Sequence, residues 1–283
     1  MKKYFLTALL LPVLSWGCET FDDCEPLARA GEAEAQNMLG LMYITGLGVP
    51  QDFTEAARWS RKAAEQGLAQ AQSNLGAMYA EGQGVPQDDA EAVKWTRKAA
   101  EQGLADAQYN LGQHYHHGKG LRQDSAEAIK WWRRAAEQGA ELAQFNLGLT
   151  YHNGDVVSQD YAEAVNWYLK AAVQGYFMAQ YNLAIMYAEG EGVPQDYAEA
   201  VKWARRAAEQ GDDNAQYLLA SMYYHGWGVS QNYSEAYVWF AMAAAIGAED
   251  AIKNRDITAE QLSPLKLFAA KRRAIKLFEQ IYQ

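Results

Sequence analysis

Hydrophobic residues recur along this chain with the spacing of one face of a helix. In the segment that begins at residue 71, the side chains of Ala71, Leu75, Met78 and Tyr79 fall on one side of a helix with 3.6 residues per turn. Gly82 is expected to end this helix, because glycine adopts the left-handed conformation of a helix C-terminus at little cost. The glycines and proline that follow are typical of a turn.

A second helical pattern follows this turn. Asp88 stands in the N-cap position with Glu91 three residues later, and this pair predicts a capping box in which each side chain bonds an otherwise unpaired backbone amide. Gly103 is expected just beyond the C-terminus of the second helix. The apolar positions between them share one side: Ala92, Val93, Trp95, Ala99 and Ala100. The sequence therefore predicts a helical hairpin.

This hairpin pattern repeats with a constant period. An Ala-Gln pair recurs every 36 residues, at Ala35, Ala71, Ala107, Ala143, Ala179 and Ala215. A fixed period of this length indicates supersecondary units that stack and bury a continuous core between neighbours. We therefore predict an all-α protein, an α/α solenoid of six helix-turn-helix repeats over residues 35–250.

The second repeat resembles the Sel-one-like repeat, a relative of the tetratricopeptide repeat. The residues that carry the resemblance are Leu75-Gly76, Tyr79, Gly82-x-Gly84-Val85, Asp88, Ala92, Trp95, Ala99-Ala100 and Gly103. The resemblance implies a right-handed solenoid that serves as an adaptor or binding scaffold, often exported in bacteria. Two departures stand out. Asp155-Val156 replaces the second loop glycine of the fourth repeat, so we expect a different turn there, and Ala184 and Ala220 replace a glycine in the middle of the first helix.

The side of each first helix that faces away from the core is the candidate binding surface. Counted from the alanine, positions 1, 5, 8 and 9 point to the core, so Tyr79 and Tyr187 are expected to be buried, whereas positions 3, 7 and 10 point away. The resemblance implies that this side, which we call the variable face, lines a concave surface. The candidate residues are Tyr109, Gln113, His116, Phe145, Leu149, His152, Tyr181, Ile185, Tyr217 and Tyr224.

Aromatic residues occupy position 3 in four successive repeats, and two interpretations remain open. As anchors of a groove, these rings would bind a peptide or a protein segment. As packing elements, they would contact each other and fill the interior of the superhelix. The asparagines at position 4, such as Asn74, are expected to bond a neighbouring helix, although they could also bind the backbone of a ligand.

The first residues have the features of a bacterial signal peptide. Lys2 and Lys3 precede a short apolar stretch, and Gly17 stands before Cys18, so we expect a signal peptide over residues 1–17. Cys18 then has two alternative fates. It could form a disulfide with Cys24, as expected for a periplasmic or secreted protein, or it could carry the lipid anchor of an outer-leaflet lipoprotein.

The two ends of the repeat array are expected to be caps. Residues 18–34 form a predicted N-terminal cap segment, because the stretch from Glu25 to Gly31 aligns with the end of a second helix. Residues 251–283 form a predicted C-terminal capping helix that Ser263-Pro264 can start, with a membrane-surface helix as the alternative. No segment is long and apolar enough to span a membrane.

Composition narrows the possible functions. A net charge of −10, from 25 Lys+Arg and 35 Asp+Glu, argues against nucleic-acid binding. The five histidines do not form a converging set of metal ligands, and no phosphate-binding loop or nucleophile motif occurs. We expect no cofactor and no catalysis. The leading hypothesis is an exported scaffold that binds a protein or peptide on the concave face, and the alternative is a cell-envelope hydrolase that acts on β-lactam or cell-wall substrates.

Overall fold

The structure, a computed structural model, describes residues 18–245 and 247–282, and this part of the chain contains fifteen helices and no strand. The chain divides into two compact units, and the boundary along the sequence lies between Gln138 and Gly139. Unit 1 contains α1 (Phe21–Ala30), α2 (Ala33–Thr45), α3 (Phe53–Glu65), α4 (Ala69–Glu81), α5 (Asp89–Glu101), α6 (Ala105–His117) and α7 (Ser125–Glu137). Unit 2 contains α8 (Glu141–Asn153), α9 (Tyr161–Val173), α10 (Phe177–Glu189), α11 (Tyr197–Glu209), α12 (Asp213–His225), α13 (Tyr233–Ala244), α14 (Glu249–Glu260) and α15 (Pro264–Tyr282).

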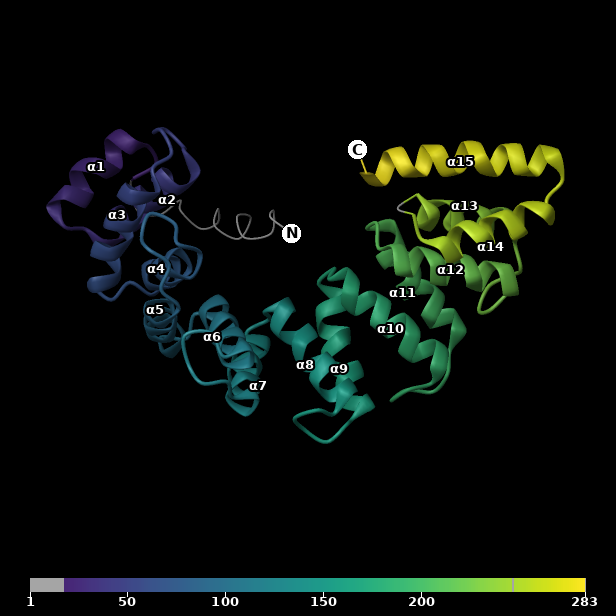
Figure 1. The fold of residues 1–283 in the computed structure, drawn as a ribbon, viewed down its shortest axis with the longest axis horizontal. Coiled ribbons are helices and arrows are strands. Elements are labelled where there is room, and N and C mark those ends of the chain that lie inside the picture. The colour runs from purple at the N-terminus through teal and green to yellow at the C-terminus, as the bar shows by residue number, and fades with distance from the viewer. Residues whose placement is uncertain (1–17, 246, 283) are drawn as a thin grey trace. The chain divides into compact units, whose positions relative to one another are not determined.

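Each repeat is a helical hairpin that packs on the next one within its unit. In unit 1, α2 packs on α3, α4 on α5 and α6 on α7, and the second helix of each hairpin also contacts the first helix of the next (Figure 1). Unit 2 repeats this scheme with α8 on α9, α10 on α11 and α12 on α13. The predicted all-α solenoid is confirmed.

The constant residues of the repeat form the core of each hairpin. The leucine at position 5 is fully buried in all six repeats, as Leu39, Leu75, Leu111, Leu147, Leu183 and Leu219. The glycine beside it allows the two helices to approach closely. A Cβ atom at Gly76 would lie 3.1 Å from the backbone nitrogen of Thr96 and 3.2 Å from the carbonyl oxygen of Ala92. The first helix therefore packs directly on the backbone of the second.

A buried glutamine network, which was not predicted from the sequence, joins consecutive repeats. The side-chain Nε2 of Gln72 donates to the carbonyl of Ala64 at 3.1 Å, and its Oε1 accepts from Nε2 of Gln102 at 2.8 Å. Gln102 also donates to the carbonyl of Gly67 at 2.9 Å. The glutamine pairing recurs in unit 2 at Gln144–Gln174 and Gln180–Gln210. These amides satisfy backbone carbonyls at helix ends, and the carbonyl of Ala64 among them is buried.

The predicted capping box forms only in part. The Asp88 carboxylate accepts from the backbone nitrogens of Ala90 and Glu91, as expected. The backbone nitrogen of Asp88, however, donates to the carbonyl of Tyr79 at 3.0 Å, and the Glu91 carboxylate pairs with Lys94 at 2.7 Å. The prediction that the Glu91 side chain bonds the N-cap amide is therefore wrong, because that amide donates to a carbonyl of the first helix.

The turn of the fourth repeat differs from the others, as predicted. In the other five repeats both loop glycines have positive φ, for example 69° at both Gly82 and Gly84. In the fourth repeat Gly154 has φ of 75°, whereas no residue other than glycine has positive φ in the described part of the chain. Val156 therefore adopts an ordinary backbone conformation, because its Cβ disfavours the left-handed region.

The N-terminal segment is fastened by a disulfide between Cys18 and Cys24. Cys24 and Ala28 of α1 pack with Leu39 and Met42 of α2, so α1 covers the first face of the repeat array in unit 1. The predicted signal peptide, residues 1–17, lies outside the described residues.

The C-terminal segment contains two helices instead of the single one expected. Helix α14 continues the stack against α13, and α15 begins at Pro264 and packs on α13 (Figure 1). The Tyr282 hydroxyl accepts from Nε2 of Gln216 at 3.1 Å and donates to the carbonyl of Gly211 at 3.2 Å. Between repeats, a glutamine such as Gln102 bonds the buried glutamine and the glycine carbonyl of the preceding repeat. At the end of the array, the Tyr282 hydroxyl takes the place of that glutamine. The other side of α15 exposes Leu265 and Phe268.

Candidate functional site

The ten candidate residues of the variable face lie on four first helices. Helix α6 of unit 1 carries Tyr109, Gln113 and His116, and in unit 2 α8 carries Phe145, Leu149 and His152, α10 carries Tyr181 and Ile185, and α12 carries Tyr217 and Tyr224. All are half-buried except His116, which is exposed. The face is therefore partly accessible over its whole length in each unit.

The aromatic residues at position 3 are shared between core and surface. The ring of Phe145 lies 5.8 Å from that of Tyr168 on α9 and 5.0 Å from that of Tyr176. Tyr217 packs edge-on against Phe240 at 5.4 Å, and its hydroxyl accepts from Nδ2 of Asn254 at 2.7 Å. These two rings therefore pack partly against the core, although helical periodicity places position 3 on the side away from it. An aromatic side chain on the second helix covers one side of the Phe145 ring and of the Tyr217 ring.

The position-9 tyrosines are less uniform than expected. Tyr79 is buried and its hydroxyl accepts from Arg61, whereas Tyr187 is only half-buried. Leu169 stands 18 residues before Tyr187, whereas Arg61 stands 18 residues before Tyr79. Asn74 bonds Asn37 of the preceding repeat at 3.2 Å, in agreement with the structural role expected for position 4.

A cavity of about 310 Å³ opens on the variable face of unit 2, and we call it the α8–α10 cavity. Its walls combine three residues that were predicted to bind, Leu149, His152 and Ile185, with six that were not: Asn153, Tyr168, Asn182, Met186, Glu189 and Glu191. Of these six, Asn182 is one of the position-4 asparagines. The volume is at the lower end of the range of ligand sites, about 300–1,000 Å³, so it suits a side chain better than a cofactor.

Tyr168 lines the cavity from α9 and has a buried hydroxyl. Tyr168 is 1% exposed, and its hydroxyl has no hydrogen-bond partner within bonding geometry. Burial raises the pKa of Tyr168 far above its ordinary value because the phenolate would be desolvated, and a weak hydrogen bond with the Asn182 side chain opposes this rise. Gly148 makes room for the ring, since a Cβ there would lie 2.5 Å from Cδ1 of Tyr168.

The rim of the cavity is polar and acidic. Nε2 of His152 lies 3.5 Å from a carboxylate oxygen of Glu191, and its Nδ1 lies 3.2 Å from Oδ1 of Asn153. The ring of His152 also contacts Tyr161 at 5.4 Å. Glu189, the last residue of α10, is exposed beside them. Two carboxylates thus flank one histidine at the opening.

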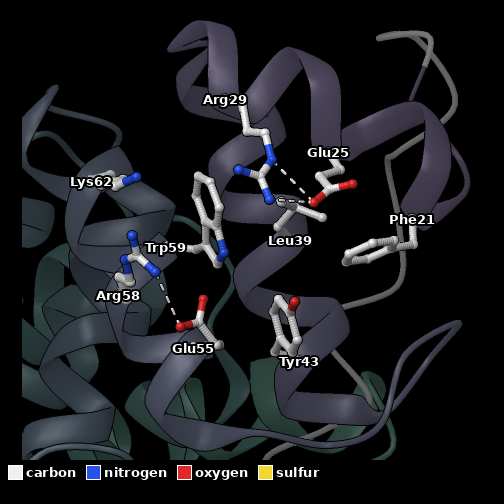
Figure 2. A pocket seen from close by; sticks show the side chains of 9 residues that line it. All are labelled: Phe21, Glu25, Arg29, Leu39, Tyr43, Glu55, Arg58, Trp59 and Lys62. Carbon is white, nitrogen blue, oxygen red and sulfur yellow. Dashed lines mark hydrogen bonds and ion pairs between the residues drawn. The ribbon is translucent and has the colours of Figure 1, made fainter.

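A second cavity, of about 280 Å³, lies in unit 1 and is shown in Figure 2. Its charged side chains already have partners. Arg29 pairs with Glu25 at 2.7 Å and Arg58 with Glu55 at 3.3 Å, and the Lys62 ammonium lies 4.1 Å from the ring centre of Trp59 (Figure 2). Because these contacts are internal, the cavity of unit 1 offers a ligand fewer unsatisfied groups than the α8–α10 cavity.

The histidines of α6 make structural contacts. Nδ1 of His114 donates to the carbonyl of Lys119 at 3.0 Å, and burial lowers the pKa of this histidine. The rings of His116 and His117 contact each other at 4.7 Å. Within the described ranges, no three His, Cys, Asp or Glu side chains are grouped closely enough to hold a metal ion.

Comparison with known proteins identifies the repeat. The Sel1 repeat model matches residues 33–68, 69–104, 105–139, 142–176, 177–212 and 213–247. The chain belongs to the Sel1 repeat family. Sel1 repeat proteins generally mediate protein–protein interaction and are typically non-catalytic scaffolds. The resemblance inferred from the repeat residues is therefore confirmed.

Two solved structures illustrate the family. One is a protective antigen present in uropathogenic Escherichia coli strains that displays an SLR fold, with 42% identity and a TM-score of 0.83 over 90% of this chain. This chain spans 56% of that longer protein. The other is a Sel1 repeat protein from Oxalobacter formigenes, with 37% identity and a TM-score of 0.72 over 82% of this chain and 67% of that chain. No curated protein matches the chain significantly.

No helix in the part of the Sel1 repeat chain that the structure describes has the length and hydrophobicity needed to cross a membrane.

Proposed function

We propose that this Sel1 repeat protein is an exported scaffold that binds a segment of another protein on its variable face, with the α8–α10 cavity as the principal anchor site. The observation that carries the proposal is the cavity itself, which combines the apolar side chains of Leu149, Ile185 and Met186 with polar ones such as His152 and Asn182. Such concave sites with a few polar groups are typical of places where a partner's side chain inserts.

The position-3 aromatics support a binding role for the same face. Phe145 and Tyr181 are half-buried, so each keeps part of its ring accessible while the rest is held by the core. Rigidly held aromatic side chains lose little conformational entropy when a partner binds. The variable face therefore offers preorganised apolar contacts beside the cavity.

The proposed export is supported by the sequence of residues 1–17 and by the Cys18–Cys24 disulfide. Disulfides persist mainly in oxidising compartments such as the periplasm or the cell exterior. The sulfur of Cys18 cannot hold a disulfide and a lipid thioether at the same time. The mass of the mature protein separates these alternatives, since acylation adds the mass of the acyl chains.

Site-specific photo-crosslinking in the source cell tests the binding face. We expect a photoreactive residue at Ile185, which lines the cavity, to capture one reproducible protein partner. The same residue at Val173, which is 65% exposed on α9 and does not line the cavity, is the matched control. Introducing Ile185→Glu into an otherwise native chain is expected to abolish binding of the identified partner. Equal capture from both positions would place the partner elsewhere on the molecule.

A further inference from the structure

Helix α15 packs on α13 of unit 2 with one of its sides (Figure 1). Ala270 and Ala274 are buried in a cluster with Tyr237 of α13, and the Arg273 guanidinium pairs with the carboxylate of Glu235 in the first turn of α13. These contacts fix the rotation of α15 about its axis, so they determine which side of the helix points away from α13.

Three large apolar side chains stand on the side of α15 that points away from α13. Leu265 is 79% exposed, Phe268 is 61% exposed and Ile275 is 62% exposed. Spacings of three and seven residues place them on one side of the helix. No described element of the chain covers them. Large apolar residues grouped on one exposed surface are typical of a place where a protein or a membrane binds.

Basic side chains lie among these apolar ones. The Arg272 guanidinium is 6.0 Å from the ring centre of Phe268. Lys271, Arg272 and Lys276 are exposed, and none of them pairs with a described carboxylate. The helix carries five basic residues and one acidic residue, although the whole chain has a net charge of −10. We call the exposed apolar and cationic side chains together the outer face of α15: Leu265, Phe268, Lys271, Arg272, Ile275 and Lys276.

A surface of this composition matches an anionic phospholipid bilayer. Apolar side chains enter the boundary between headgroups and acyl chains, while lysine and arginine extend their charged ends to the phosphates. Each cation near such a surface strengthens the attraction. Salt screens charges beyond about 8 Å at physiological ionic strength, so the charges of α15 decide this attraction even though the chain is acidic.

Charge argues against a second copy of the chain as the occupant. A symmetric contact between two copies places the same surface on itself. Two outer faces in contact would bring the basic residues of both helices together, and like charges at such distances repel each other. A bilayer supplies negative charge over its whole area, and it accommodates Leu265, Phe268 and Ile275 without a preformed pocket for each of them.

We propose that the outer face of α15 binds the surface of an anionic phospholipid membrane, with its apolar side chains inserted below the headgroups and its cations on the lipid phosphates. The helix lies along the surface, because both kinds of side chain are distributed over residues 265–276. This inference goes beyond the proposed function, since α15 carries none of the residues of the variable face. The scaffold would hold its protein partner beside a membrane.

Binding of the purified full chain to lipid vesicles tests the proposal. The vesicles contain phosphatidylglycerol mixed with phosphatidylcholine, and vesicles of phosphatidylcholine alone are the zwitterionic control. In flotation assays we expect the dissociation constant for the anionic vesicles to be about tenfold or more below that for the control vesicles. All variants keep the full chain length, so residues 1–17 contribute equally to each measurement.

A fluorescent label reports whether α15 itself enters the bilayer. The two cysteines of the chain are paired with each other, so Leu265→Cys provides a free thiol for an environment-sensitive dye. We expect its fluorescence to rise and shift to shorter wavelength with the anionic vesicles. The same dye at Val173→Cys, on the exposed side of α9, is the control and should not respond.

Two triple variants with equal charge loss provide the matched comparison. The first neutralises the outer face, and the second neutralises exposed cations of unit 1: Lys271→Gln, Arg272→Gln and Lys276→Gln against Lys98→Gln, Lys119→Gln and Arg122→Gln. The first is expected to raise the dissociation constant for anionic vesicles about tenfold or more, and the second should leave it unchanged.

A second pair of variants tests the apolar side chains. Phe268→Ala with Ile275→Ala is expected to raise the same dissociation constant about tenfold or more, because less apolar surface enters the bilayer. Leu47→Ala with Val173→Ala removes exposed apolar side chains elsewhere and should have no effect on it. Thermal unfolding of all variants should match the native chain, since the replaced side chains are exposed.

Three outcomes would overturn the membrane surface. They are equal binding to both kinds of vesicle, equal weakening by both triple variants, and a silent label at residue 265. Absence of vesicle binding together with self-association that the outer-face variants abolish would assign α15 to a second copy of the chain, and would overturn it as well. In each case photo-crosslinking from Ile185 remains an independent measure of whether the variable face binds a protein.

Discussion

Repeat 2 in unit 1 and repeat 4 in unit 2 have the same framework but fill it differently. Leu75 and Leu147 are both fully buried at position 5, and a glycine follows each of them. In repeat 2 the glycine faces the hydroxyl of Thr96, whereas in repeat 4 it faces the ring of Tyr168. The constant positions thus hold the hairpin, and the residue opposite the glycine decides what lies beneath the variable face.

The comparison also explains why the cavity occurs where it does. The position of Tyr168 is occupied in the other repeats by Ser60, Thr96, Trp132, Ala204 and Phe240. Tyrosine is the member of this set that places a hydroxyl at the far end of an aromatic ring. Its ring occupies the space left free by Gly148, and Tyr168 contributes to the wall of the cavity between α8 and α10.

The largest expected effect tests whether the two frameworks are equivalent. Leu75→Ala and Leu147→Ala each remove a fully buried side chain, and each should lower the free energy of unfolding by about 2–5 kcal/mol. Thermal and urea unfolding measure the loss. The half-buried Leu149→Ala is the control and should cost clearly less. A large loss at one leucine only would show that the repeats differ in their frameworks.

A smaller effect is expected at the two glycines. Gly148→Ala brings a Cβ to 2.5 Å from a ring atom of Tyr168, and because the ring is fully buried we expect a loss of about 1–3 kcal/mol. Gly76→Ala should lower the free energy of unfolding by less, because the Thr96 hydroxyl can rotate away from the added Cβ. The backbone nitrogen of Thr96, at 3.1 Å from that Cβ, keeps the loss above zero.

A double-mutant cycle checks the cause of the Gly148 effect. Combining Gly148→Ala with Tyr168→Ala restores the pair found in repeat 5, Ala184 with Ala204. The double variant should be more stable than the sum of the two single changes by about 0.5–3 kcal/mol. Simple additivity would mean that the ring is not what excludes a Cβ at Gly148.

The smallest expected effect concerns the Tyr168 hydroxyl. Tyr168→Phe removes a buried group that has no hydrogen-bond partner, so stability should stay the same or rise. Tyr217→Phe is the matched control, because the Tyr217 hydroxyl accepts from Asn254 at 2.7 Å and its loss should cost about 0.5–1.5 kcal/mol. Thermal unfolding of both variants measures the two changes in stability. A clear loss in Tyr168→Phe would contradict the unpartnered hydroxyl.

The period, the hairpins and the family could be predicted from the sequence, because they depend on local patterns. Apolar spacing within one helix places Leu75 in the core, Asp88 at an N-cap and Gly103 beyond a helix end, and the structure shows all three there. The altered turn at Val156 was equally predictable, since it depends on the conformational range of a single residue.

The cavity and the partial burial of the position-3 rings were decided only by tertiary structure. Helical periodicity assigns Phe145 to one side of α8, but the size of Tyr168 on α9 and the path of Tyr176 determine how much of that ring is covered. The same holds for Glu189 and Glu191, which the sequence places at the end of a helix and in a loop. Their relation to His152 and Tyr168 depends on distances between three helices, and no pattern within one helix encodes those distances.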